Sequence, residues 1–317
     1  MEKIKAQIRK CGKPTDFFLL ASFLAILMVM VGGALSGITD RLIPFDKIFN
    51  AIAGDEAIGT FLGMYFDFYG IWILFFIVNL AFKANRPIAR QLSFKGTGNG
   101  IKGLLIGCLL GFGTNGFCIL MSALVGDIKL SFNGFNPLLF ILFFICVTIQ
   151  SGAEEIVDRA YLYQKLRRRY RHPAVAIILN ALVFMALHLT NPGIGILPIL
   201  QIVIVAIFFS LLVYYYDCLW AAIMMHASWN FCQSIFFGLP NSGIVSAYSV
   251  FKLEAASARN GFFYNADFGV EGSPAAVILL TILCIVIVMI NRGKSEKHDL
   301  WAEMEAEAES NAAAAAE

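Results

Sequence analysis

Three short motifs place chemically active side chains four residues apart inside apolar segments. The motifs are Glu154-Glu155-x-x-x-Arg159, Phe184-x-x-x-His188 and His226-x-x-x-Asn230. Side chains at this spacing share one face of a helix. An ionisable group inside a membrane costs about 2.5–3.5 kcal/mol on insertion scales, so it is kept only with a partner or a task. A carboxylate beside two imidazoles can serve that task as a general base that activates water.

The two adjacent glutamates point about 100° apart on a helix, so we predict different roles for them. Glu155 precedes Arg159 by four residues, which is the favourable order for an ion pair. We interpret that pair as structural, which leaves Glu154 free to face the histidines. Asp158 follows Glu154 by one turn, and it either couples to the titration of Glu154 or lies at the aqueous end of the helix.

The composition indicates a polytopic membrane protein. Of the 317 residues, 59% are hydrophobic and 15% are charged, whereas a soluble domain has about 25% charged residues. The net charge of +2 gives no indication of a nucleic-acid partner, and the seven cysteines are scattered without metal-binding spacing. We therefore predict that the cysteines are small buried hydrophobic residues that form no disulfides.

Eight apolar segments approach or exceed the roughly 20 residues that a membrane-spanning helix needs. They are residues 17–38, 58–82, 104–125, 137–163, 174–189, 196–216, 219–237 and 275–290. The first has no cleavage site of a signal peptide, so we interpret it as a retained anchor. The predicted fold is an all-α bundle of about eight transmembrane helices over residues 17–291, with the active site inside it and the motifs in a core at 137–237.

Basic residues place both chain ends on the same side of this bundle. Most of the 24 lysines and arginines lie in a basic arm at 1–16, in the loops 83–102 and 165–171, and in the tail 292–317. These segments share one side of an eight-span protein, which the positive-inside rule makes cytoplasmic. We expect a multi-pass protein of the cell membrane with the loop 239–273 outside. The Ala/Glu-rich tail has no apolar face and is predicted to be solvated.

Small and polar residues within the spans are interpreted first as packing. Glycines recur every four residues at Gly103, Gly107 and Gly111, and less clearly at Gly33 and Gly37, which allows close approach of helices. Five polar residues are expected to make interhelical hydrogen bonds or to lie at the interface, rather than to act in catalysis: Asp67, Asn115, Gln150, Asn180 and Gln201.

The four histidines fall into two groups. His172 and His298 lie among basic residues and are predicted to be solvated, whereas His188 and His226 lie inside spans. At about 1.5 Å per helical residue, Glu154 and the residues of the two histidine motifs lie roughly 13–24 Å from the basic side. These depths permit one cavity near the middle of the membrane.

In this order on successive membrane helices, the three motifs resemble the CPBP family, which comprises CAAX prenyl proteases and bacterial Abi-type glutamate intramembrane proteases. The resemblance covers about residues 137–237. In the family, the first motif commonly has an apolar residue before the arginine and a glycine after it. Here these positions are Asp158 and Ala160.

The resemblance implies a role for each motif residue. Glu154 and His188 would activate water, and His226 and Asn230 would stabilise the oxyanion through their hydrogen-bond donors. The supporting residues would be Glu155, Arg159 and Phe184.

We therefore expect an intramembrane endopeptidase that acts on a membrane-associated peptide or protein. The alternatives are a non-enzymatic immunity or scaffold protein that retains the protease fold, and a small-solute transporter, which the lack of an internal repeat disfavours. Catalysis without a metal is favoured because the chain has no HExxH motif. The alternative cofactor is zinc, held by Glu154, His188 and His226. A prenylated substrate is not favoured.

Overall fold

The computed structural model describes residues 8–9, 11–95, 97–293 and 299–314. Much of the predicted basic arm and the stretch around His298 lie outside these residues. The described elements are α2 (Phe18–Thr39), α3 (Phe45–Ala53), α4 (Glu56–Phe66), α5 (Tyr69–Ala81), α6 (Arg86–Ala89), α7 (Ile101–Leu124), β1 (Leu130–Phe132), α8 (Pro137–Glu155), α9 (Tyr163–Arg169), α10 (Pro173–Leu187), α11 (Ile196–Tyr216), α12 (Leu219–Phe231), β2 (Phe251–Leu253), α13 (Pro274–Ile290) and α14 (Leu300–Ala314). The π-helical segments Ile156–Leu162 and Cys232–Phe236 follow α8 and α12.

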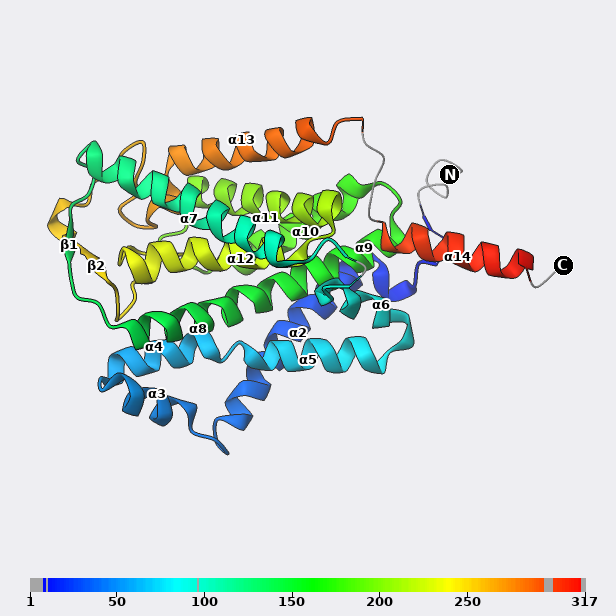
Figure 1. Cartoon of the computed structure of the whole chain (residues 1–317), viewed down its shortest axis with the longest axis horizontal. Helices are drawn as coiled ribbons and strands as arrows, with labels where there is room; N and C mark the ends of the chain where they lie inside the picture. Colours follow the sequence, from blue (N-terminus) through cyan, green and yellow to red (C-terminus); the bar gives the residue numbers. More distant parts are fainter. Residues whose placement is uncertain (1–7, 10, 96, 294–298, 315–317) are drawn as a thin grey trace.

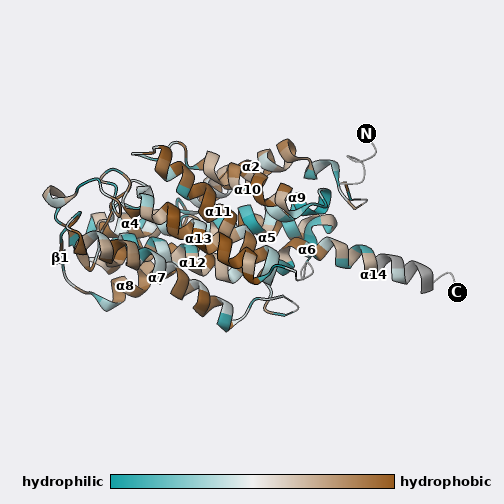
Figure 2. Ribbon diagram, turned by 90° about the horizontal axis from the view of Figure 1, so that it is seen from above, coloured by the Kyte–Doolittle hydropathy of each residue, from teal (hydrophilic) through white to brown (hydrophobic). Residues whose placement is uncertain are grey.

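The protein is a polytopic membrane protein. Within the described residues, five helical stretches are long and apolar enough to cross a membrane: Phe18–Thr39, Glu56–Ala81, Ile101–Leu124, Pro137–Arg169 and Ile196–Tyr216. The three other predicted spans coincide with the shorter apolar helices α10 and α13 and with the buried helix α12. Hydrophobic colouring dominates these helices in Figure 2.

Helix α12 lies at the centre of the bundle. Figure 1 shows it between α8 on one side and α7 and α11 on the other, and all of these neighbours contact it. Helices α2, α4 and α5 cover the far side of α8, and α10 and α13 pack on α11. Helix α12 is therefore the innermost of the three motif-bearing helices, with α8 beside it, whereas α10 packs on the outer side of α11.

The segment before α2 and helix α14, which are the described parts nearest the two chain ends, lie at the same end of the molecule as α6 and α9 (Figure 1). The opposite end carries β1 and β2, which pair antiparallel with Leu130 opposite Leu253. This arrangement agrees with an even number of crossings. The membrane side on which the ends lie stays a prediction.

The predicted glycine face of α7 packs tightly against α12. A Cβ atom at Gly107 would overlap the carbonyl oxygen of Ala221, and one at Gly111 would overlap that of Met225. At Gly103 a Cβ atom would meet the sulfur of Cys218. Only a residue without a side chain lets the two backbones come this close, so the packing prediction is confirmed for these glycines.

The prediction that Gly33 and Gly37 allow close approach of helices is wrong. A Cβ atom at Gly33 or Gly37 would meet no atom of the described residues within 4 Å, whereas a Cβ atom at Gly32 would overlap Ile71 of α5. Close approach therefore occurs one residue earlier, at a glycine outside the four-residue pattern.

The predicted span 58–82 is interrupted between α4 and α5. The hydroxyl group of Ser36 in α2 donates to the carbonyl oxygen of Asp67 and accepts from the backbone N–H of Gly70 at 3.1 Å. A side chain inserted into the hydrogen-bond ladder is a known cause of a helix break. The break brings residues of both α4 and α5 to the wall of the cavity described below.

The basic cluster after the predicted fourth span is buried instead of forming a solvated loop. Lys165, Arg167 and Arg168 are 1%, 2% and 1% exposed, because α9 continues the long helix past the predicted end of the span. Arg168 bonds both carboxylate oxygens of Asp16 at 2.6 Å, and Arg167 bonds Asp299 at 2.5 Å. The arm before α2 and the segment before α14 thus neutralise this cluster.

The tail is anchored at its first turn, so the prediction of a wholly solvated tail is wrong there. Trp301 is 3% exposed, and its indole N–H donates to the carbonyl oxygen of Gln164 at 2.8 Å. The guanidinium group of Arg168 lies 4.8 Å from the indole centroid, within cation–π range. Because the tail is rich in alanine and glutamate, its composition gave no indication that Trp301 is buried against α9.

Candidate active site

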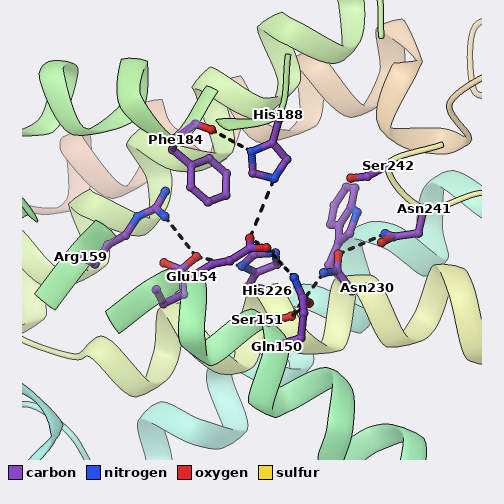
Figure 3. A network of polar contacts seen from close by, with 12 residues as sticks. Gln150, Ser151, Glu154, Arg159, Phe184, His188, His226, Asn230, Asn241 and Ser242 are labelled. Carbon is purple, nitrogen blue, oxygen red and sulfur yellow. Dashed lines mark hydrogen bonds and ion pairs between the residues drawn. The ribbon is translucent and has the colours of Figure 1, made fainter. Parts of the chain in front are cut away.

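The carboxylate group of Glu154 is the point at which the three motifs meet (Figure 3). It extends from the last turn of α8, and its Oε2 lies 3.9 Å from Nε2 of His188 and 3.7 Å from Nε2 of His226. Its Oε1 accepts a hydrogen bond from Gln150 at 2.5 Å. One carboxylate oxygen is therefore fixed on its own helix, while the other faces two imidazoles from other helices.

The orientation of His188 follows from its backbone contact. The residue caps the C-terminus of α10, and its Nδ1 lies 2.8 Å from the carbonyl oxygen of Phe184. A carbonyl oxygen only accepts, so Nδ1 carries the proton. In the neutral ring, Nε2 is then an acceptor, as is Oε2 of Glu154 at a distance of 3.9 Å. The ring of Phe184 packs against this imidazole at 4.5 Å between centroids.

His226 lies between the two glutamates. Its Nδ1 is 2.8 Å from Oε1 of Glu155, and its Nε2 faces Glu154. Since a carboxylate accepts, Nδ1 carries a proton here too. The ring of Phe209 stacks on the imidazole at 5.5 Å with an interplanar angle of 23°.

The predicted ion pair between Glu155 and Arg159 is confirmed. The two side chains are fully buried and 3.2 Å apart. The guanidinium group also lies 4.3 Å from the ring centroid of Phe184 and 5.2 Å from that of Phe209, so aromatic faces share its charge. The pair is more than structural, however, because the same carboxylate oxygen of Glu155 also binds His226.

The segment Ile156–Leu162 after the glutamates is π-helical. Single π-helical turns within α-helices occur frequently at functional sites. The side chain of Asn180 donates to the freed carbonyl oxygen of Asp158 at 2.7 Å. Asp158 itself is 1% exposed and lines the cavity. Its predicted alternative place at the aqueous end of the helix is therefore wrong.

Asn230 lies one turn beyond His226, on the same face of α12. Its Nδ2 donates to the hydroxyl group of Ser151 at 3.3 Å, and its Oδ1 accepts from Asn241 at 3.1 Å (Figure 3). Asn241 belongs to the loop 239–273. Through Asn241, this loop therefore contacts the motif residue Asn230.

The site opens into a cavity of about 380 Å³. Its polar wall is formed by four motif residues, Glu154, His188, His226 and Asn230, together with Gln150, Asp158 and Asn241. The opposite wall comes from α2, α4 and α5, through Val29, Met64, Tyr65, Phe68 and Ile71. A mostly apolar chamber with a few convergent polar groups is the usual form of a ligand site.

The polar residues that were expected to make interhelical hydrogen bonds or to lie at the interface differ in their contacts. Asn115 donates to Gln233 at 2.7 Å, and Asn180 bonds the π-helical segment, so these two make the expected hydrogen bonds between helices. Gln150 instead binds Glu154 and lines the cavity, which corrects its packing assignment. Gln201 lines a smaller adjoining cavity of about 40 Å³.

Several residues at the site carried no signal in the sequence. Ser151 precedes the glutamates by a few positions, and Asn241 and Glu271 come from a loop without a motif. Their contacts depend on how that loop folds back into the bundle. His172, in contrast, is exposed as predicted, and it caps α10 by accepting from the backbone N–H of Ala174.

The metal alternative can be compared with this geometry. Within the described part of the chain, no group of three or more histidine, cysteine, aspartate or glutamate side chains is arranged to hold a metal ion. Glu154, His188 and His226 do converge, with Nε2 of His188 3.9 Å and Nε2 of His226 3.7 Å from Oε2 of Glu154.

The fold and the cavity define a polytopic membrane protein with a glutamate–histidine–asparagine centre inside its helices. Residues 135–232 match the family described as Type II CAAX prenyl endopeptidase Rce1-like, so the chain carries a CPBP/Abi domain of this family. The matched segment runs from just before α8 to just after α12 and contains all three motifs. Comparisons with curated proteins and with solved structures gave no match.

Proposed function

We propose that the protein is an intramembrane endopeptidase that hydrolyses a peptide bond of a membrane-associated peptide or protein. The family of residues 135–232 implies an intramembrane protease. One observation carries the catalytic assignment: Nε2 atoms of two histidines converge on Oε2 of Glu154 at the wall of a 380 Å³ cavity. Such a carboxylate is suited to accept a proton from water.

Glu154 is the general base in this proposal. A water molecule held by its carboxylate group and by His188 gives a proton to Oε2, while the water oxygen bonds to the substrate carbonyl carbon. The same proton then passes to the amide nitrogen as the C–N bond breaks, which returns the carboxylate to its ionised form. The hydrogen bond from Gln150 to Oε1 keeps Oε2 turned toward the histidines.

His226 and Asn230 stabilise the oxyanion of the tetrahedral intermediate. Asn230 contributes its amide N–H, and His226 contributes Nε2–H when its ring is protonated. Glu155 favours that imidazolium through the hydrogen bond at Nδ1. Arg159 and Phe184 in turn hold Glu155 in place. A single oxyanion donor contributes roughly 2.7–4 kcal/mol to lowering the barrier.

Cleavage of defined reporters tests the proposal. Purified protein in lipid nanodiscs is incubated in H₂¹⁸O with a farnesylated CAAX peptide, the same peptide without the prenyl group, and a transmembrane peptide. We expect one reporter to be cleaved with one ¹⁸O atom in the new carboxylate, and the Glu154→Gln variant to cleave none. Equal cleavage by this variant would remove Glu154 as the base. If no reporter is cleaved, the non-enzymatic immunity or scaffold alternative is favoured.

Chelation separates the metal-free proposal from the zinc alternative. We expect the activity to survive exhaustive treatment with phenanthroline, and the purified protein to contain well under one equivalent of zinc. A zinc site would give reversible chelator inhibition. His188→Ala and His226→Ala would then lose the bound zinc, whereas Asn230→Ala would keep it.

We also propose that both chain ends are cytoplasmic in the cell membrane. The basic segments and both ends lie together at one end of the molecule, which supports this orientation by the positive-inside rule (Figure 1). Single cysteines at Arg171 and Ala256, both exposed and at opposite ends, should be labelled from opposite sides of sealed vesicles on a cysteine-free background. Labelling from the same side would contradict this topology.

A further inference from the structure

A short piece of the loop 239–273 is pinned inside the bundle next to the site. The side-chain amide of Gln233 donates to the carbonyl oxygen of Pro240 at 2.5 Å, and Asn115 of α7 donates to Gln233 at 2.7 Å. Gly269, with a left-handed φ of 81°, packs against the same carbonyl group, where a side chain would overlap it. Asn241 follows Pro240 directly in the chain. Its position is therefore fixed through Pro240 by Asn115 of α7 and by Gln233 of the π-helical segment after α12.

Glu271 is the polar centre of this loop structure. It is 5% exposed and lies just before α13. Its Oε1 accepts from the indole N–H of Trp229 and from Nδ2 of Asn241, both at 3.1 Å. Its Oε2 accepts from the backbone N–H of Ser242 at 2.9 Å. The carboxylate is thus surrounded by donors from α12 and from the loop.

These contacts determine which way two asparagine side chains face. Oε1 of Glu271 accepts from the indole N–H of Trp229, and it likewise faces the NH₂ group of Asn241 as an acceptor. That same Nδ2 reaches Oδ1 of Asn230 at 3.1 Å. The carbonyl end of Asn230 must then face Asn241, which turns its NH₂ group to Ser151 and the cavity. A reversed amide would set two NH₂ groups against each other.

We propose that Glu271 and Asn241 are positioning residues that orient the amide of Asn230 so that its N–H points at the substrate carbonyl oxygen. The inference rests on the proposed function and deepens it, because it makes the loop 239–273 part of the oxyanion site. Neither residue takes part in proton transfer. Because Asn241 donates to Glu271 and to Asn230 through the same NH₂ group, the acceptor oxygen of Glu271 fixes the direction of the hydrogen bond at Asn230.

The Asn241→Leu variant tests this role, since leucine keeps the approximate size and removes the donor. Complete loss of an oxyanion donor lowers kcat by about 100- to 1,000-fold. A donor that is present but free to rotate should lose less, and we expect kcat to fall by about tenfold, with KM unchanged. The matched control is Asn260→Leu. Asn260 is exposed in the same loop and binds the backbone N–H of Ala266, away from the site, so its variant should retain the wild-type kcat.

A double-mutant cycle distinguishes positioning from a general structural role. If Asn241 acts through Asn230, Asn241→Leu should have no further effect on kcat in an Asn230→Ala background. An equal loss in both backgrounds, a rise in KM alone, or no loss at all would overturn the inference.

A second measurement does not depend on activity. In protein labelled with ¹⁵N-asparagine, the side-chain NH₂ signals of Asn230, assigned by their loss in Asn230→Ala, should shift in Asn241→Leu and stay in place in Asn260→Leu. Unchanged signals in Asn241→Leu would overturn the inference. If the wild type cleaves no reporter, the proposed function fails, and these signals alone decide whether Asn241 orients Asn230.

Discussion

Two buried clusters of charge lie on the same long helix, Pro137–Arg169, and they are built differently. The first lies at the candidate site and consists of Glu154, Glu155, Asp158 and Arg159. The second lies two turns further on, where α9 meets the chain ends, and joins four basic residues to two acids: Arg9, Lys165, Arg167, Arg168, Asp16 and Asp299.

The clusters differ in how fully their polar atoms are bonded. At the chain ends, Arg168 uses Nε and Nη2 for Asp16 and Nη1 for the carbonyl oxygen of Ala84. At the site, Arg159 uses only Nη1, and its Nε and Nη2 have no hydrogen-bond partner among the described residues. In the same part of the chain, Oε2 of Glu154 and Oδ1 of Asp158 also have none.

This difference separates a structural cluster from a functional one. A buried polar atom without a hydrogen bond costs about 1–3 kcal/mol, so native proteins bond nearly all of them. In the cluster at the chain ends, Nε of Arg9 is the one such atom among the described residues, so this cluster has fixed geometry and little capacity left for a ligand. The incompletely bonded cluster carries that cost next to a cavity, where water and substrate can be bound.

The largest expected effect is the loss of activity in Glu154→Gln. Glutamine keeps the shape of the side chain and an oxygen for the bond from Gln150, but it cannot accept a proton from water. General-base catalysis contributes about 100- to 10,000-fold, and we expect kcat to fall by this range. The melting temperature should stay within a few degrees of the wild type.

The exposed loop residue Glu254 provides the control for this variant. Glu254→Gln makes the same chemical change in the loop 239–273 and should keep both activity and stability. Full turnover by Glu154→Gln would place the base elsewhere in the incompletely bonded cluster, with Asp158 as the first candidate.

Arg159→Ala should affect both stability and activity. Removing one partner of a buried ion pair costs about 3–5 kcal/mol, because the other charge is left unpaired. Here the remaining charge is Glu155, which also holds Nδ1 of His226. We therefore expect the melting temperature and the kcat of the folded fraction to fall together. Loss of stability with an unchanged kcat would make Glu155 a purely structural residue, as the sequence alone suggested.

Arg168→Ala should instead affect stability alone. It removes the bidentate pair with Asp16 and the contact with Trp301, for an expected loss of about 3–5 kcal/mol. The kcat of the folded fraction should not change. The control is Arg171→Ala, at an exposed arginine one turn away. A kcat that falls with Arg168→Ala would show that the two clusters are coupled along the helix.

The pH dependence of this cluster follows from Asp16. Burial raises the pKa of this carboxyl group, but the hydrogen bonds and charge of Arg168 outweigh burial and hold the pKa below its ordinary value of 3.8. An acid with a lowered folded-state pKa stabilises the protein above its unfolded-state pKa, and this contribution is lost as the pH falls through the folded-state value. The stability difference between wild type and Arg168→Ala should therefore shrink below about pH 4.

The sequence predicted the positions of the motifs better than their surroundings. Four-residue spacing is a local property of helices, so the ion pair of Glu155 with Arg159 and the tight α7 face at Gly107 followed from it directly. Asn241 and Glu271 could not be predicted, because their contacts depend on the path of an irregular loop. The burial of Arg168 was missed since charge counts assign a basic run to solvent unless its distant acidic partner is known.

A buried acid outside both clusters, Asp217, provides the smallest and most specific test of the comparison. It follows α11, is 9% exposed, and has a left-handed φ of 47°. Burial raises its pKa from 3.8 to about 6, against the lowering effect of a hydrogen bond from Gln91. An acid with a raised folded-state pKa destabilises the protein as the pH rises from about 4 to above 6, by roughly 3 kcal/mol at most. Asparagine avoids this cost and also tolerates the left-handed conformation.

We expect Asp217→Asn to stabilise the protein at pH 7.5 by about 1–3 kcal/mol in thermal or denaturant unfolding, with no gain from charge removal at pH 4. An equal gain at both pH values would assign the effect to the backbone alone. A loss of activity in this variant would mean that a buried acid outside the cavity also serves the reaction, and the contrast between the two clusters would then no longer identify the site.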